Sequence, residues 1–138
     1  MELTNRIADE LTRIFGADTT IYTENQDNNF NEPCFYICKV STTAGPRLCG
    51  HQRRVYTYQV IYFTNSRQAN ADLDRVEKLL LDNFDKLPEF AYICNREFNT
   101  DYTEKTLTVV FDIPINAHKV VVENKMQEET TDAKTNIK

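Results

Sequence analysis

The chain has 138 residues, 41% of them hydrophobic, and a formal net charge of −5. This length suits one domain with a single core. The acidic balance disfavours a nucleic-acid binder held by phosphate contacts, because such domains usually present a basic face. No run approaches the roughly eighteen apolar residues needed to cross a bilayer. The first residues lack a signal-peptide pattern, so we expect a cytosolic origin and no membrane partner.

The N-terminal residues predict an amphipathic helix. Apolar side chains recur every three or four positions and face polar ones, at Leu3, Ile7, Leu11 and Ile14 or Phe15. Glycine adopts positive φ at little cost, so Gly16 is expected to end this helix.

Two extended segments are predicted next. A short strand is expected over 19–23, followed by a polar loop over 24–32. The strand predicted over 34–41 has apolar residues on both faces, which is typical of a central position in a sheet. Gly45 and Pro46 are typical of a turn, and we expect the chain to reverse there.

The run 52–63 predicts a strand with both faces partly covered. Its aromatic face consists of Tyr56, Tyr58, Val60 and Tyr62. A long helix is predicted over 69–87, with an apolar stripe of Leu73, Val76, Leu80, Phe84 and Leu87. Pro88 is expected to end it, because proline cannot continue a helix.

The last elements predicted are two strands, 90–98 and 105–117, joined by the polar turn 99–104 into an antiparallel hairpin. The order helix, three strands, helix, two strands predicts an α+β fold, in which two helices pack on one face of a mostly antiparallel sheet. We expect one domain over 1–122. The polar segment 123–138 is expected to be disordered when free, or to become ordered on assembly.

The cysteines and histidines do not form a recognisable reactive site. Cys34 and Cys38 fall about 13 Å apart on one strand face at roughly 3.3 Å per residue, too far for a disulfide. Cys49, His51 and His118 show no metal-ligand spacing. Reduced thiols that behave as small hydrophobic side chains are therefore expected, with no metal and no cofactor.

No common catalytic motif occurs in the chain. GxGxxG, P-loop, GxSxG, HExxH and CxxC patterns are all missing from the sequence. His51 and His118 are acid–base candidates by residue type, yet no partner motif accompanies them. Adjacent carboxylates such as Asp72 and Asp74 are more simply explained by the preference for acidic residues near a helix N-terminus. An enzyme is not expected.

Three motifs in order resemble a family of tail terminator, or tail completion, proteins of phages, prophages and phage-tail-like particles of Gram-positive bacteria. These are Ile21-Tyr22-x-Glu24-Asn25, Phe30-x-Glu32-Pro33-Cys34-Phe35 and Arg53-Arg54-x-Tyr56-x-Tyr58-x-Val60-x-Tyr62-Phe63. The resemblance covers about residues 3 to 120. It implies a ring, expected to be a homohexamer, at the head-proximal end of a tail tube.

Such a ring would stop tube polymerisation and offer a docking surface to the head connector. The implied partners are further copies of the chain, the tail tube protein, the sheath where one exists, and the head–tail connector. The expected location is the virion tail or a tail-like particle, after a stage in the host cytoplasm. DNA would pass through an acidic lumen without being held, because like charges repel.

Individual residues have two interpretations each within that implied ring. Arg53 and Arg54 could form ion pairs with a neighbouring subunit or the tube, or could be ordinary solvated residues beside a strand. Tyr56, Tyr58 and Tyr62 suit either a core or an interface. Glu32 and Pro33 are expected to fix a turn rather than to contact a partner.

Two other functions remain open from the sequence. A head–tail connector or stopper, or another minor tail protein, would also be a small α+β ring subunit. A host regulatory or enzymatic domain is the third possibility.

Overall fold

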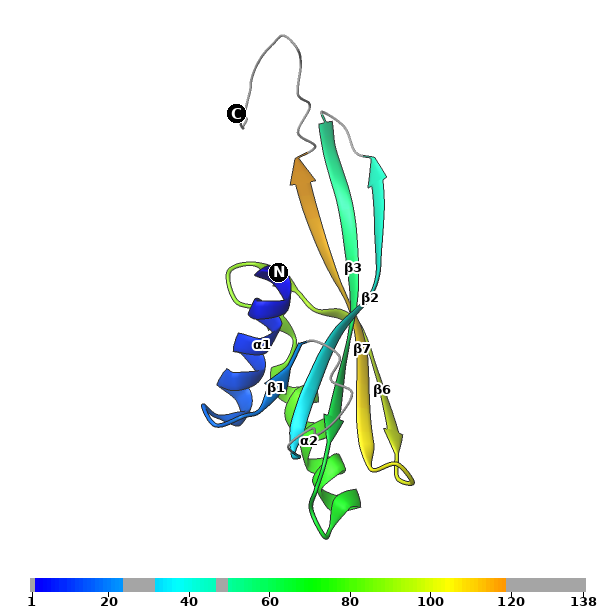
Figure 1. The fold of residues 1–138 in the computed structure, drawn as a ribbon. Coiled ribbons are helices and arrows are strands. Elements are labelled where there is room, and N and C mark those ends of the chain that lie inside the picture. Colours follow the sequence, from blue (N-terminus) through cyan, green and yellow to red (C-terminus); the bar gives the residue numbers. More distant parts are fainter. Residues whose placement is uncertain (1, 24–31, 47–49, 119–138) are drawn as a thin grey trace. The chain divides into compact units, whose positions relative to one another are not determined.

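A computed structural model describes residues 2–23, 32–46 and 50–118 (Figure 1). Its elements in chain order are α1 (Glu2–Phe15), β1 (Ile21–Tyr22), β2 (Cys34–Pro46), β3 (His51–Phe63), α2 (Ala69–Asn83), β4 (Lys86–Leu87), β5 (Ala91–Tyr92), β6 (Cys94–Asp101) and β7 (Thr106–His118). The predicted loop over 24–32 and the segment 123–138 lie largely or wholly outside the described residues.

The chain divides into two compact units, which we call the body and the arm. The body comprises Met1–Thr42 and Tyr56–Pro114, and the arm comprises Thr43–Val55 and Ile115–Lys138. Within the arm the structure describes the ends of β2 and β7 and the start of β3. The expected division into 1–122 and a C-terminal tail stays a prediction.

The main sheet has five strands in the order β1-β2-β3-β7-β6. The short β1 runs parallel to β2, whereas β6 runs antiparallel to β7. The pairing of β3 with β7 is antiparallel as well. The Thr64 amide donates to the Lys105 carbonyl at 3.5 Å, and the Thr57 hydroxyl donates to Asp112. The predicted α+β fold with a mostly antiparallel sheet is therefore confirmed, and β2 lies inside the sheet as expected.

The first helix follows its predicted pattern. Leu3, Ile7 and Leu11 are all buried, since their spacing of four places them on one face of α1. Figure 1 shows α1 and α2 on the same side of the sheet within the body. The helix ends at Phe15, and the following Gly16 has φ of +113° while its amide donates to the Thr12 carbonyl at 2.8 Å. A positive φ of this kind favours glycine.

Aromatic rings join the helical layer to the sheet. The centroid of the Phe35 ring on β2 lies 4.9 Å from the Phe15 ring centroid and 4.9 Å from the Tyr62 ring centroid. Beyond the end of α2, Phe84 meets Phe111 of β7 edge to face at 5.1 Å, and both are fully buried. These contacts place the body's core between the helices and one face of the sheet.

The second helix is shorter than predicted, and Pro88 does not end it. α2 stops at Asn83, whereas the apolar stripe continues through the buried residues Phe84 and Leu87. Arg96 of β6 explains the early end. Its guanidinium donates to the carbonyls of Leu80 and Phe84, at 2.9 and 2.8 Å, and so satisfies acceptors that a helix end leaves open.

Replacing Arg96 by methionine is expected to lower the free energy of unfolding by about 1–3 kcal/mol, because buried carbonyls lose charged donors. Methionine keeps an unbranched apolar stem, so most of the packing remains. Urea denaturation of both proteins measures the change. Arg67→Met, at an exposed position before α2, is the control and should stay within about 0.5 kcal/mol of the parent. Equal losses for the two variants would contradict a capping role for Arg96.

The turn predicted at Gly45 and Pro46 is wrong. Both residues belong to β2, which extends five residues beyond the predicted Ser41. Proline is tolerated at the end of a strand, where no further ladder hydrogen bond from its nitrogen is needed. The Gly-Pro pair therefore stands at the last residues of β2, and the chain does not turn at these two residues.

The predicted strand 90–98 is divided in two. Ala91–Tyr92 pairs with Lys86–Leu87 in a separate small sheet, fixed by the Ile93 amide donating to the Asp85 carbonyl at 3.0 Å. β6 begins only at Cys94. The antiparallel hairpin of β6 and β7 is confirmed, although its turn starts at Tyr102 rather than at Asn99.

Candidate assembly surfaces

The predicted tyrosine set divides between core and surface. Tyr58 and Tyr62 are only 1% and 5% exposed within the body, whereas Tyr56 is half-buried. The Tyr58 hydroxyl lies 3.4 Å from the Thr4 hydroxyl of α1. The packing thus holds two of the three rings against the helices, and Tyr56 keeps more accessible surface. Their role at an interface stays a prediction.

A carboxylate at the start of α2 organises a polar cluster that was not predicted. The Tyr62 and Thr64 hydroxyls each donate to Asp72 Oδ2 at 2.7 Å, and the Arg75 guanidinium donates to Oδ1 at 2.8 Å. Burial alone would raise the pKa of Asp72, but these hydrogen bonds and the Arg75 charge outweigh it and lower the pKa. Burial and the Asp72 carboxylate together raise the pKa of Tyr62. The cluster connects the end of β3 to the start of α2, and it keeps the Tyr62 phenol protonated at neutral pH.

The signal that could have identified this cluster was weak. Tyr62 and Thr64 are two residues apart at the end of a strand, so they share a face, and Asp72 lies in the first turn of the next helix. The acidic preference of a helix N-terminus already accounted for Asp72, and nothing in the pattern showed that two hydroxyls converge on it.

The thiols of the described residues resemble core side chains in their environment. Burial, and next the Glu32 charge, raise the pKa of Cys34 to about 11, so this thiol is protonated at neutral pH. Burial also raises the pKa of Cys38. Cys34, Cys38 and Cys94 are free, and the described part of the chain contains no cluster of His, Cys, Asp or Glu that could hold a metal.

Glu32 and Pro33 lie in a bend directly before β2. Both are exposed, the peptide bond between them is cis, and the Asn65 side chain donates to the Glu32 carbonyl at 2.9 Å. This hydrogen bond ties the entrance of β2 to the loop after β3. The observed position suits the predicted turn, whereas contact with a partner remains untested.

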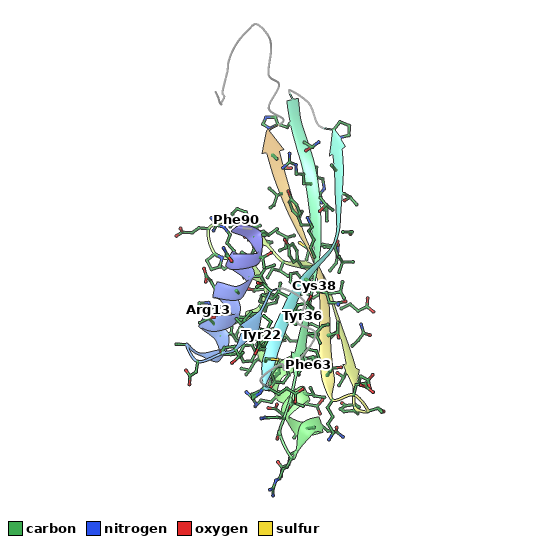
Figure 2. The ribbon with its side chains drawn as sticks, in the orientation of Figure 1. Arg13, Tyr22, Tyr36, Cys38, Phe63 and Phe90 are labelled. Carbon is green, nitrogen blue, oxygen red and sulfur yellow. The ribbon has the colours of Figure 1, made fainter. Side chains whose placement is uncertain are left out.

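The side of the sheet that faces away from the helices forms what we call the outer face. Thr57 and Gln59 of β3 lie on it, since the alternate residues Tyr58 and Val60 are buried under the helices. Side-chain hydrogen bonds join the strands across it. The Gln59 amide reaches Cys38 Sγ at 3.6 Å, and Asn95 Nδ2 donates to Asp112 at 3.0 Å. Figure 2 labels Tyr36 and Cys38 on β2 and Phe63 at the end of β3.

The outer face combines apolar and acidic side chains. Its apolar members are half-buried or exposed: Tyr36, Val40, Ile61, Phe63 and Val110. Its charged members are carboxylates, at Glu97, Asp101 and Asp112. By strand alternation, no described Lys or Arg of the four long strands falls on this face of the body. An apolar surface bordered by charges of one sign is typical of an interaction site.

The described charged residues of the arm are Arg53 and Arg54, both on β3. Arg53 is exposed, and half-buried Arg54 donates through Nε to Gln52 Oε1 at 2.6 Å. His51 begins the same strand, and His118 ends β7. The structure therefore places both predicted arginines on β3 in the arm, with their side chains on opposite faces of the strand, whereas the three tyrosines belong to the body.

These features define a structural subunit, with a packed α+β body and surfaces suited to contacts with other chains. The family model described as phage tail terminator protein matches residues 2–128. The chain belongs to this phage tail terminator family, whose role is structural, and the resemblance stated from the sequence motifs is confirmed.

A comparison with solved structures gives a distant likeness. The chain is 12% identical to the sheath/tube terminator of an extracellular contractile injection system, PVC, solved by cryo-EM in the extended state, with a TM-score of 0.46. The match covers 94% of this chain and 64% of that one, so the chain spans somewhat less than two thirds of that terminator's length. No curated protein matches the chain in sequence. Among the described residues, no helix is long and apolar enough to span a bilayer.

Proposed function

We propose that this protein is the tail terminator of a phage or phage-tail-like particle and acts without catalysis. Copies form a closed ring, of six subunits by analogy with the family, on the head-proximal end of the tail tube. The ring stops tube growth and offers its other side to the head connector. The observation that carries this proposal is the family match over residues 2–128.

The geometry of the body supports such a role. A subunit that ends a polymer needs a rigid frame and at least two distinct contact surfaces, because a closing ring uses a heterologous contact between neighbours. The body supplies the frame through its aromatic core, and the outer face remains available for contacts. The Asp72 cluster holds its polar groups in a satisfied network rather than presenting them to a ligand.

The partners proposed are the tube protein, the sheath in a contractile particle, and the connector on the head side. Assembly starts in the host cytoplasm and ends in the virion tail. Duplex DNA passes through the ring without specific binding, since the chain carries a net charge of −5. The polar segment 123–138 is proposed to order only in the assembled particle.

Negative-stain electron microscopy of tail tubes tests the terminator function. Purified tube protein is polymerised with and without an excess of this chain. We expect a density cap at one end of each tube and a tube length that stops increasing once the chain is added. The control is an unrelated acidic protein of similar size.

Two outcomes would contradict this proposal. Tubes of unchanged length with bare ends would exclude termination. Binding to purified connector rings, with tubes left unaltered, would favour the connector or stopper alternative instead.

A further inference from the structure

Charge is distributed unevenly between the two units. Among the described residues, the body contains nine Lys and Arg against fifteen Asp and Glu. The arm contains Arg53 and Arg54 and, among its described residues, no carboxylate. A basic arm on an acidic chain is electrostatically complementary to another copy of the same chain.

The outer face offers the corresponding acidic surface. Glu97 of β6 is exposed and lies directly opposite Val110 of β7 in the register, so a carboxylate stands beside an apolar side chain. Asp112, two residues further on the same face, is held by the Thr57 hydroxyl at 2.7 Å and by Asn95. An arginine presented here would meet a carboxylate and could pack its stem on apolar surface.

We propose that the arm of one copy docks on the outer face of the next copy's body, with Arg53 and Arg54 against the carboxylates of β6 and β7. The partner is therefore a second copy of this chain. The contact joins two different surfaces, so it repeats from subunit to subunit and can close into a ring. This inference rests on the proposed function, since it names the contact by which terminator subunits recognise each other.

The chemistry favours this occupant over a nucleic acid. Two described arginines on opposite faces of β3 supply few phosphate contacts, whereas duplex binding usually requires several along one basic face. Arginine also pairs with carboxylates through a planar fork of donors, which suits a protein surface that carries them. The apolar members of the outer face would gain nothing from a phosphate backbone, but they can pack against a strand of a neighbouring subunit.

Charge-reversal variants of the full-length chain test the proposal. The arm variant is R53E/R54E, and the face variant is E97K/N99K, at two exposed positions that share the outer face. Each alone is expected to weaken self-association at least about tenfold, because like charges then meet at the contact. Sedimentation velocity at low salt measures the assembly, and circular dichroism checks that each variant is folded.

Combining the variants decides which surfaces meet. An equal mixture of arm variant and face variant should restore assembly, since each reversed arm finds a reversed face on its neighbour. The chain that carries all four substitutions should also assemble. The control matched to the arm variant is R67E/K86E, which changes the net charge by the same amount as R53E/R54E at exposed positions of the body and should assemble like the parent. Added salt should weaken the parent's assembly.

Several results would overturn the proposal. They are unchanged assembly of the arm variant, equal weakening in the R67E/K86E control, and a parent chain that stays monomeric both alone and with tubes. Restoration by the four-fold variant without restoration by the mixture would place the contact within one copy. Retention of duplex DNA at low salt that the arm variant loses, with assembly unchanged, would make nucleic acid the partner. If each variant loses assembly and the mixture restores it, but tubes remain uncapped, the proposed terminator function is wrong while the proposed contact between subunits is supported.

Discussion

Replacing Phe111 by alanine is expected to lower the free energy of unfolding by about 3–5 kcal/mol, the largest effect that we predict for a single residue. Phe111 of β7 is fully buried in the core and meets Phe84 edge to face, with 5.1 Å between the ring centroids. The substitution removes a buried ring and this aromatic pair together. Since a domain of this size is usually stable by only about 5–15 kcal/mol, much of its margin would be lost.

Urea and thermal denaturation measure this effect. Tyr92→Ala is the control, because this ring is also on a strand but is 70% exposed, and it should change the stability by less than about 0.5 kcal/mol. A Phe111→Ala protein as stable as that control would show that the core is not centred on the Phe84–Phe111 contact.

Replacing Asp72 by asparagine is expected to lower the free energy of unfolding by about 1–3 kcal/mol at neutral pH, because three donors lose a charged acceptor. The sign of the pH dependence follows from the lowered pKa of Asp72. Its charge stabilises the folded state above the ordinary value of 3.8, and this contribution disappears as the pH falls through the lower folded-state pKa. The difference in the free energy of unfolding between parent and variant should therefore have its largest value at pH 5–7 and decrease below about pH 4.

Urea denaturation at pH 7, 4.5 and 3 checks this dependence. Asp82→Asn on the same helix is the control, since Asp82 pairs with Lys78 at 3.2 Å on the exposed surface, and such pairs contribute little. A difference between parent and Asp72→Asn that stays constant from pH 7 to pH 3 would contradict the assigned role of the Asp72 charge.

Much of the fold could be predicted because the local signals agree with the packing. In α1 the spacing of Leu3, Ile7 and Leu11 and the following Gly16 point to the same helix that the structure shows. Alternation along β7 likewise predicts which residues are buried. Each of these elements has one solvent-exposed face and one buried face, so the spacing of its apolar residues indicates directly which side chains are buried.

The errors arose where distant contacts override local signals. The stripe through Phe84 and Leu87 continues the helical spacing, but Arg96 captures the carbonyls at the end of α2 and the chain turns into β4. The parallel pairing of β1 with β2 depends on where two residues meet in space, which periodicity does not specify. Pro88 did not end α2, which stops at Asn83, whereas the Gly45–Pro46 pair forms the end of β2 rather than the turn after it.

The candidate surfaces were only partly accessible from sequence. Residue type pointed to Arg53 and Arg54, because arginine pairs on strands are uncommon core residues. The sequence did not show that the tyrosines divide between core and surface, or that Glu97 and Asp112 share a face with Phe63. Both depend on strand order, since β3 and β7 are neighbours although more than forty residues separate them in the chain.

The outermost strand of the sheet has a consequence for the subunit before any particle exists. β6 is the last strand in the sheet order, its pairing with β7 shifts register between Cys94 and Glu97, and it carries Arg96, Glu97 and Asp101. An irregular and charged edge strand disfavours β-pairing between the sheets of separate molecules. The β6 edge is therefore poorly suited to adding a strand from another copy, which leaves side-chain contacts, rather than a continued β-sheet, as the way this edge meets a neighbour.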